Sequence, residues 1–229
     1  MKKHIIIGVS LLLLISLSSA SYSMTSISSD TIPNKIECDT YNVIIQQQND
    51  KQIVFVESKI KNKDDLEKQK TVSTQKINNY REEVKSEQET SLLTNAVATV
   101  TFNTPICIET LRTILNESNG KLKDFETKFI NDQGVWVTGS FRRLDENLIN
   151  KVINDIVESG KEQKLVYEGI TSARIRIDLL SNNYEEISAN KNVYLVDTTD
   201  TFIRLENRDY INQMKIRIPD LAWEIDKIK

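Results

Sequence analysis

The sequence predicts an α+β sandwich, in which helices cover one face of a mainly antiparallel sheet. Stretches of alternating apolar and polar residues, typical of half-buried strands, occur between stretches whose apolar residues recur every three or four positions, typical of amphipathic helices. From residue 96 onward their order is strand, helix, strand, hairpin, helix, strand, helix, strand. This order fits a ferredoxin-like βαββαβ sandwich, with a hairpin and a helix inserted at 135–160 between the second and third main strands.

The first half of the sandwich is predicted between residues 97 and 129. Residues 97–102 read as a strand, Pro105 marks a helix start, and Gly120 ends that helix. A second strand of alternating residues follows at 122–129. The helix has one apolar face, formed by Ile108, Leu111, Ile114 and Leu115.

The inserted segment has clear boundary signals. Residues 131–134, Asn-Asp-Gln-Gly, predict a turn, after which 135–138 pairs back as a hairpin. Asp145 is a helix-capping residue, and Gly160 is a typical C-terminal stop. Between these two residues lies the strongest helical pattern of the chain, formed by Leu148, Ile149, Val152, Ile153, Ile156 and Val157.

Residues 169–199 predict a strand, a short helix and a strand. Ala173, Ile175 and Ile177 alternate with polar residues, and Ser181 is expected to cap the short helix. A short apolar run then ends at Asp197. A further alternating strand is predicted at 201–205, which would return the chain to the sheet.

This same stretch resembles the second half of subtilase propeptide (I9-type inhibitor) domains. The resemblance is carried by 169–175 (Gly-Ile-Thr-Ser-Ala-Arg-Ile), Leu180-Ser181, Glu185-Glu186-Ile187 and 192–197 (Asn-Val-Tyr-Leu-Val-Asp). It implies a ferredoxin-like half that packs on a protease, with residues 198–201 entering the active-site cleft. It covers about 30 residues, and strand-helix-strand units of this kind occur in many unrelated proteins.

The N-terminal part has a different composition. Residues 1–20 have the basic, apolar and small-residue regions of a signal peptide, which predicts an exported protein without stable membrane insertion after cleavage. An uncleaved membrane anchor is the alternative. Residues 21–95 are expected to comprise a Ser/Thr-rich leader, a short hairpin at 41–56 and a polar helix at 57–95. That segment is either a spacer or coiled-coil contact, or a helix that is packed by one edge on the domain or partly disordered. Residues 96–205 form the predicted sandwich, and 206–229 a tail with a short helix.

The composition excludes several kinds of chemistry. The single histidine, His4, lies in the predicted signal peptide, so the mature chain lacks histidine-dependent catalysis, metal binding and pH switching. The net charge of −3 becomes about −5 without Lys2 and Lys3, which argues against a nucleic-acid partner. The two cysteines, Cys38 and Cys107, are predicted to form one disulfide, as is usual for a lone pair in an exported protein.

The remaining candidates for function are contact residues. Arg142 and Arg143 precede the strongest helix, Trp136 lies on the predicted hairpin, and Trp223 lies in the tail. Tryptophan and arginine are enriched where proteins bind one another, although surface-loop and core roles are the alternatives. No phosphate-binding loop, nucleophile elbow or metal-binding pattern occurs. We therefore expect a secreted or envelope-located, non-enzymatic binding or regulatory protein with a protein partner and no cofactor. A structural or tethered envelope protein with a helical spacer is the alternative.

Overall fold

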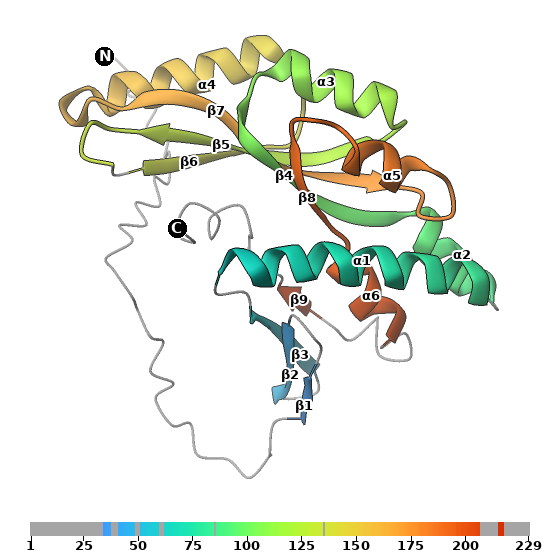
Figure 1. Ribbon diagram of the computed structural model, residues 1–229. Helices are drawn as coiled ribbons and strands as arrows, with labels where there is room; N and C mark the ends of the chain where they lie inside the picture. Colours follow the sequence, from blue (N-terminus) through green and yellow to red (C-terminus); the bar gives the residue numbers. More distant parts are fainter. Residues whose placement is uncertain are drawn as a thin grey trace, which may run out of the picture. The chain divides into compact units, whose positions relative to one another are not determined.

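The structure, a computed structural model, contains a five-stranded antiparallel sheet (Figure 1). It describes residues 34–37, 41–48, 51–59, 62–84, 86–134, 136–206 and 215–217. The strand order is β6-β5-β7-β4-β8. The predicted α+β class is confirmed. The sheet has five strands, however, and its order is not the usual four-stranded ferredoxin-like order. The strands are β4 (Ala96–Ile106), β5 (Lys121–Ile130), β6 (Trp136–Phe141), β7 (Val166–Ile177) and β8 (Val193–Asp197).

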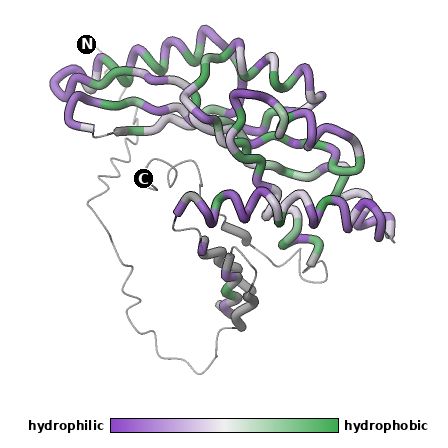
Figure 2. Tube along the Cα trace, viewed as in Figure 1, coloured by the Kyte–Doolittle hydropathy of each residue, from purple (hydrophilic) through white to green (hydrophobic). Residues whose placement is uncertain are grey.

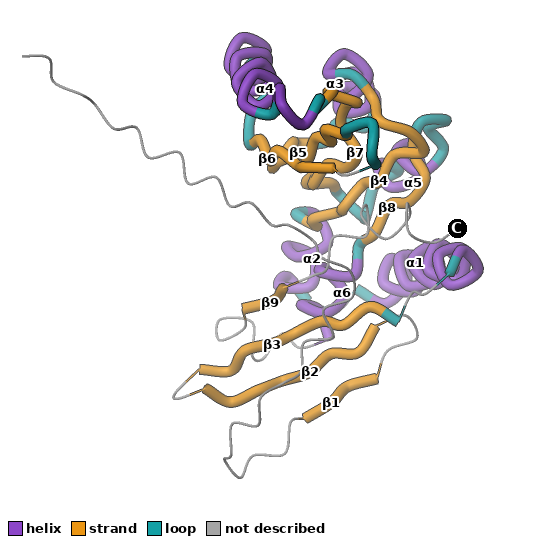
Figure 3. Tube along the Cα trace, turned by 90° about the vertical axis from the view of Figure 1, so that its left-hand side faces the viewer, coloured by secondary structure: helices purple, strands orange, loops and turns teal. Residues whose placement is uncertain are grey.

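Three helices connect these strands. Figures 1 and 3 show α3 and α4 on the same face of the sheet. The single turn η1 (Lys161–Gln163) joins α4 to β7. The helices are α3 (Ile108–Glu117), α4 (Glu146–Ser159) and α5 (Asn183–Ser188). Asn182, rather than Ser181, is the N-cap of α5, although the Ser181 hydroxyl accepts a hydrogen bond from the Asn183 N–H.

The predicted alternation of β7 is confirmed. Ala173, Ile175 and Ile177 are buried, whereas Arg174 and Arg176 are exposed. Because successive side chains of a strand point to opposite faces, the buried set meets the helices on one face. The core that results includes the wholly buried side chains Phe125, Phe129, Leu111, Ile114 and Ile149.

Gly169 lies where β7 passes an irregular part of β4. The pairing of these strands shifts in register between Thr101 and Ile106. Gly169 has φ = +136°, and a Cβ atom there would lie 2.9 Å from the carbonyl oxygen of Ile106 and 3.0 Å from Cβ of Pro105. The glycine that begins the propeptide-like stretch therefore allows a close approach of two backbones.

Helix α4 begins where the sequence predicts. Asp145 is the N-cap, and its Oδ1 accepts a hydrogen bond from the Leu148 N–H at 3.1 Å. Gly160 is the C-cap, and its N–H donates to the Ile156 carbonyl at 2.8 Å.

Replacing Asp145 by alanine is expected to lower the free energy of unfolding by about 1 kcal/mol, because the Leu148 N–H loses its acceptor. Urea denaturation measures the loss. Asp145→Asn is the matched control, since its side-chain oxygen can still accept this bond. An equal loss in both variants would mean that the negative charge, rather than the cap, stabilises the helix.

The polar segment before the sandwich forms two helices, α1 (Lys63–Glu83) and α2 (Glu87–Thr94). Hydrophilic residues predominate along α1 (Figure 2), yet one edge of the helix is buried. Ile77 of α1 and Leu93 of α2 belong to the same core cluster as the sheet residues. The helix is thus packed along one edge, the second of the two predicted arrangements. Its buried edge consists of Leu66, Gln69, Ser73 and Ile77.

The predicted strand at 201–205 is wrong. Residues Thr199–Glu206 form the helix α6, in which the N–H groups of Thr201 and Phe202 donate to the Thr198 carbonyl. Three consecutive side chains, Thr201, Phe202 and Ile203, are buried. The alternation of apolar and polar residues in the sequence therefore does not correspond to the two faces of a strand. A bidentate ion pair between Arg204 and Asp200, one helical turn apart, also suits a helix.

A separate four-stranded sheet has the order β1-β2-β3-β9. Its centre is the predicted hairpin of β2 and β3, which pair from Tyr41↔Ser58 to Gln48↔Lys51. The two outer strands, β1 and β9, were not predicted from the sequence. The strands are β1 (Asn34–Glu37), β2 (Tyr41–Gln48), β3 (Lys51–Ser58) and β9 (Lys215–Arg217). The predicted helix near the C-terminus lies outside the described residues.

Candidate functional site

Neither a metal centre nor a membrane-spanning helix is found in the part of the chain that the structure describes. There, no three His, Cys, Asp or Glu side chains lie close enough together to hold a metal ion. No described helix combines the length and the apolar character needed to cross a bilayer.

Cys107 is the N-cap of α3 and is exposed. Its sulfur lies 3.3 Å from the Thr110 hydroxyl. Cys38 lies outside the described residues, so the disulfide between the two cysteines stays a prediction.

Three of the four predicted contact residues lie along or beside one strand. Trp136 is the first residue of β6 and pairs with Ile130 of β5. Arg142 and Arg143 directly follow the last residue of β6, and both are exposed. Trp223 lies outside the described residues. Trp136 and the two arginines therefore stand at opposite ends of β6.

β6 is a regularly paired edge strand without charged residues. Within the described sheet it pairs only with β5, and the six residue pairs continue without a register shift. Its sequence, Trp-Val-Thr-Gly-Ser-Phe, contains no charged residue and no proline. Edge strands commonly carry charges, prolines or bulges that prevent pairing with other chains, and β6 has none of these. Thr138 and Ser140 are exposed on one face of this strand.

The opposite edge strand, β8, has a helix as its neighbour. Its pairing with β4 contains a register shift between Thr101 and Phe102, and α1 packs against it. Lys70 of α1 lies 4.1 Å from the ring centroid of Tyr194 in β8. The Tyr194 hydroxyl donates to Glu67, also of α1, at 3.5 Å. β8 is therefore joined to α1 by side-chain contacts.

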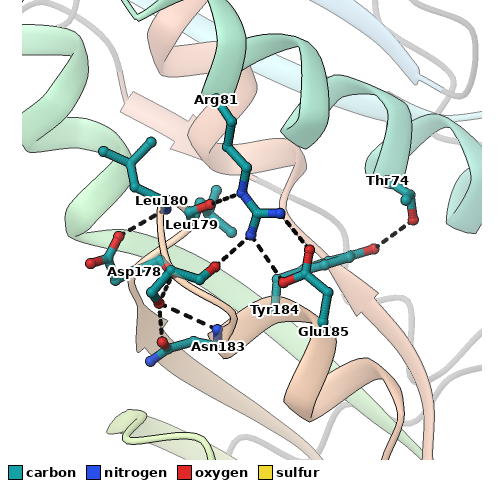
Figure 4. A network of polar contacts seen from close by, with 9 residues as sticks. Thr74, Arg81, Asp178, Leu179, Leu180, Asn183, Tyr184 and Glu185 are labelled. Atoms are coloured by element: carbon teal, nitrogen blue, oxygen red, sulfur yellow. Dashed lines mark hydrogen bonds and ion pairs between the residues drawn. The ribbon is translucent and has the colours of Figure 1, made fainter.

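An arginine fixes α1 to the segment between β7 and α5 (Figure 4). The Arg81 guanidinium donates from Nε to the Leu179 carbonyl at 2.7 Å and from Nη2 to the Ser181 carbonyl at 2.5 Å. It also forms two bonds to the Glu185 carboxylate, at 2.5 and 2.9 Å. Nearby, the hydroxyls of Thr74 and Tyr184 lie 3.4 Å apart. One planar side chain thus links α1 to three residues that lie far along the chain.

Buried polar side chains make a second link between α1 and the sheet. The Gln69 amide donates to the Asp197 carboxylate at 3.1 Å and to the Thr199 hydroxyl at 3.0 Å. The Thr199 N–H donates to the same carboxylate oxygen at 3.0 Å. Gln69 is 2 % exposed and Asp197 4 %, so α1 is positioned by specific hydrogen bonds as much as by apolar packing.

The ion pair predicts a pH dependence. The hydrogen bonds from Arg81 hold the pKa of Glu185 below its ordinary value. A lowered carboxylate pKa adds stability at neutral pH that is lost as the pH falls through the folded-state pKa. We expect the unfolding free energies of wild type and Glu185→Gln to differ at about pH 7, and the difference to shrink as the pH falls below the ordinary carboxylate pKa of 4.5 and through the folded-state pKa. Urea titrations across this range measure the difference. A constant difference would mean that ionisation of Glu185 is not responsible.

A shallow groove of about 500 Å³ lies at the junction of α1 and α2. It is lined by Val84, Ser86, Glu87, Thr90, Ser91 and Thr94. The Thr90 and Thr94 hydroxyls donate to carbonyls of the preceding helical turn, which leaves them poorly placed to bind a ligand.

The features of the β6 edge could be predicted only in part from the sequence. The signal for contact residues, tryptophan and paired arginines, was present. The openness of β6 depends on its outer position in the sheet, which no local pattern encodes. Arg81 was missed altogether, because an arginine in a polar helix gives no signal of its partners. No protein-family model, curated protein or solved structure gives a significant match to the chain.

Proposed function

We propose that the chain is an exported, non-enzymatic protein-binding protein that binds through strand addition at β6. In this mode an extended segment of another chain hydrogen-bonds to the free backbone groups of an edge strand. The observation that carries the proposal is the regular, uncharged outer edge of β6, followed by the exposed Arg142 and Arg143. Export is supported by the signal-peptide pattern of residues 1–20.

We further propose that the scaffold is ferredoxin-like, with an addition at one edge. Without β6, the remaining strands follow the order β5-β7-β4-β8, and each neighbouring pair is antiparallel. Along the chain they alternate with α3 and α5 as βαββαβ, if β6 and α4 are treated as an insertion. On this interpretation, the inserted hairpin and helix supply the binding strand.

The resemblance to subtilase propeptides supports a protease as one possible partner class. An inhibitory role would have to use a surface other than 198–201. Thr198 and Thr201 are buried, and Thr199 begins α6, so this segment is not an extended arm. The spacer alternative is less well supported, because α1 is held against β8 and α5.

The test compares the wild-type protein with an edge variant, Thr138→Lys/Ser140→Lys. Both positions are exposed, and lysines on an edge oppose strand pairing. The control, Thr113→Lys/Asn116→Lys, adds the same charge to exposed positions of α3. Each tagged protein is used for affinity purification from the surface and medium of the cells that produce it. We expect a protein retained by wild type and control and lost with the edge variant, and hydrogen exchange at 136–141 slowed by its binding. Retention that does not depend on β6 would contradict the proposal.

A further inference from the structure

We propose that the strand added to β6 is β6 of a second copy of the chain, so that two sheets join into one across a twofold axis. This inference rests on the proposed function and names the partner of the same edge. Pairing of identical strands about a twofold axis is necessarily antiparallel, and an isologous interface requires a surface that complements itself. β6 meets that requirement in its backbone and in the charges at its two ends.

The middle of β6 is neutral and regular. Thr138 and Gly139 are its central residues, and neither carries a charge that a second copy would meet as a like charge. The unshifted pairing with β5 keeps the outer backbone groups in the regular alternation of narrow and wide pairs that an antiparallel strand needs. Gly139 fits closely against β5, because a Cβ there would lie 2.9 Å from the Thr127 hydroxyl. No other strand of the described sheet covers the outer edge of β6.

The charges lie at the two ends and are opposite in sign. The turn before β6 contains Asp132, whose side chain is 57 % exposed and pairs with Lys164 at 2.8 Å. Arg142 and Arg143 follow the other end. Antiparallel pairing centred on Thr138 places Arg143 of one copy opposite Gln133 of the other, next to Asp132, twice across the axis. Complementary charges of this kind fix register and favour the correct encounter.

An axis through Gly139 is the alternative register, in which Arg142 of one copy lies opposite position 136 of the other. In the register centred on Thr138, an acid before β6 and an arginine after it lie near one another on both sides of the axis. This placement of Asp132 and Arg143 is self-complementary, which favours a second copy over an unrelated strand.

Sedimentation equilibrium of the purified protein tests the inference. We expect a dimer at micromolar concentration, at least a tenfold weaker association for Thr138→Lys/Ser140→Lys, and no change for Thr113→Lys/Asn116→Lys. Circular dichroism checks that each variant is folded. A dimer that survives the edge substitutions would overturn the inference, as would a monomer at about 100 µM, well above the Kd of a specific dimer.

Cysteine cross-linking tests the geometry directly. In a Cys38→Ser/Cys107→Ser background, Thr138→Cys should cross-link to itself if the axis passes through position 138. If the axis passes through position 139, a mixture of Thr138→Cys and Ser140→Cys should cross-link instead. Thr113→Cys should do neither, and cross-linking at position 113 alone would contradict pairing through β6.

The outcomes separate this inference from the proposed function. A monomeric protein whose β6 edge captures a different protein overturns the second-copy inference and leaves strand addition standing. A monomer that captures nothing through β6 overturns both.

Discussion

Replacing Gly169 by alanine is expected to lower the free energy of unfolding by about 3 kcal/mol, because two costs combine at this position. The residue has φ = +136°, which L-residues rarely adopt, and the new methyl group would lie 2.9 Å from the Ile106 carbonyl oxygen. That oxygen and the Pro105 carbonyl carbon belong to the backbone of β4, so they cannot move aside as a side-chain terminus can.

Gly134→Ala is the matched control. Gly134 also has a positive φ, +76°, but no atom lies within 4 Å of its would-be Cβ. We expect a loss of about 1 kcal/mol from backbone strain alone. Chemical denaturation of both variants isolates the steric component. Equal losses of unfolding free energy in the two variants would show that contact with the β4 backbone adds nothing to the cost of a methyl group at position 169.

Arg81→Ala is expected to lower the free energy of unfolding by about 2 kcal/mol, because the Leu179 and Ser181 carbonyls and the Glu185 carboxylate lose their donor together. The loss stays moderate because the side chains of Arg81 and Glu185 are 25 % and 46 % exposed, and water can replace part of the network. Hydrogen exchange of α1 should also become faster, since the helix loses a main attachment.

Two further variants identify which contacts matter. Arg81→Lys keeps the charge but lacks the planar fork that reaches two carbonyls and a carboxylate at once, so we expect little rescue. Glu185→Ala should cost less than Arg81→Ala, because the bonds to both carbonyls remain. A loss in Glu185→Ala as large as in Arg81→Ala would assign the whole effect to the ion pair.

Helices and strands whose ends and buried faces are marked by nearby residues were predicted correctly. Asp145, the apolar repeat and Gly160 define α4 from both ends and from its buried face, and the structure agrees. In β7 the buried Ala173, Ile175 and Ile177 alternate with exposed arginines, so one face alone needed to be apolar. Such elements carry their own boundaries in the sequence.

The failures occurred where tertiary contacts decide the structure. Residues 201–205 contain apolar residues at positions that suit a strand, yet α6 buries consecutive side chains because it is enclosed on more than one side. α1 looked solvated because two residues of its buried edge, Gln69 and Ser73, are polar. The buried amide nitrogen of Gln69 donates to Asp197 and Thr199, which lie far along the chain.

The two edges of the five-stranded sheet, β6 and β8, have different neighbours, which bears on how copies of the chain could assemble. A sheet with both edges bare could add copies at either side and extend into a ribbon or fibre of undefined length. Here α1, with Lys70 and Glu67 against Tyr194, occupies the β8 side. Pairing through β6 would therefore leave β8, with α1 beside it, at the outer side of each five-stranded sheet. A pair of chains joined about a twofold axis is closed, because each copy uses its β6 edge once.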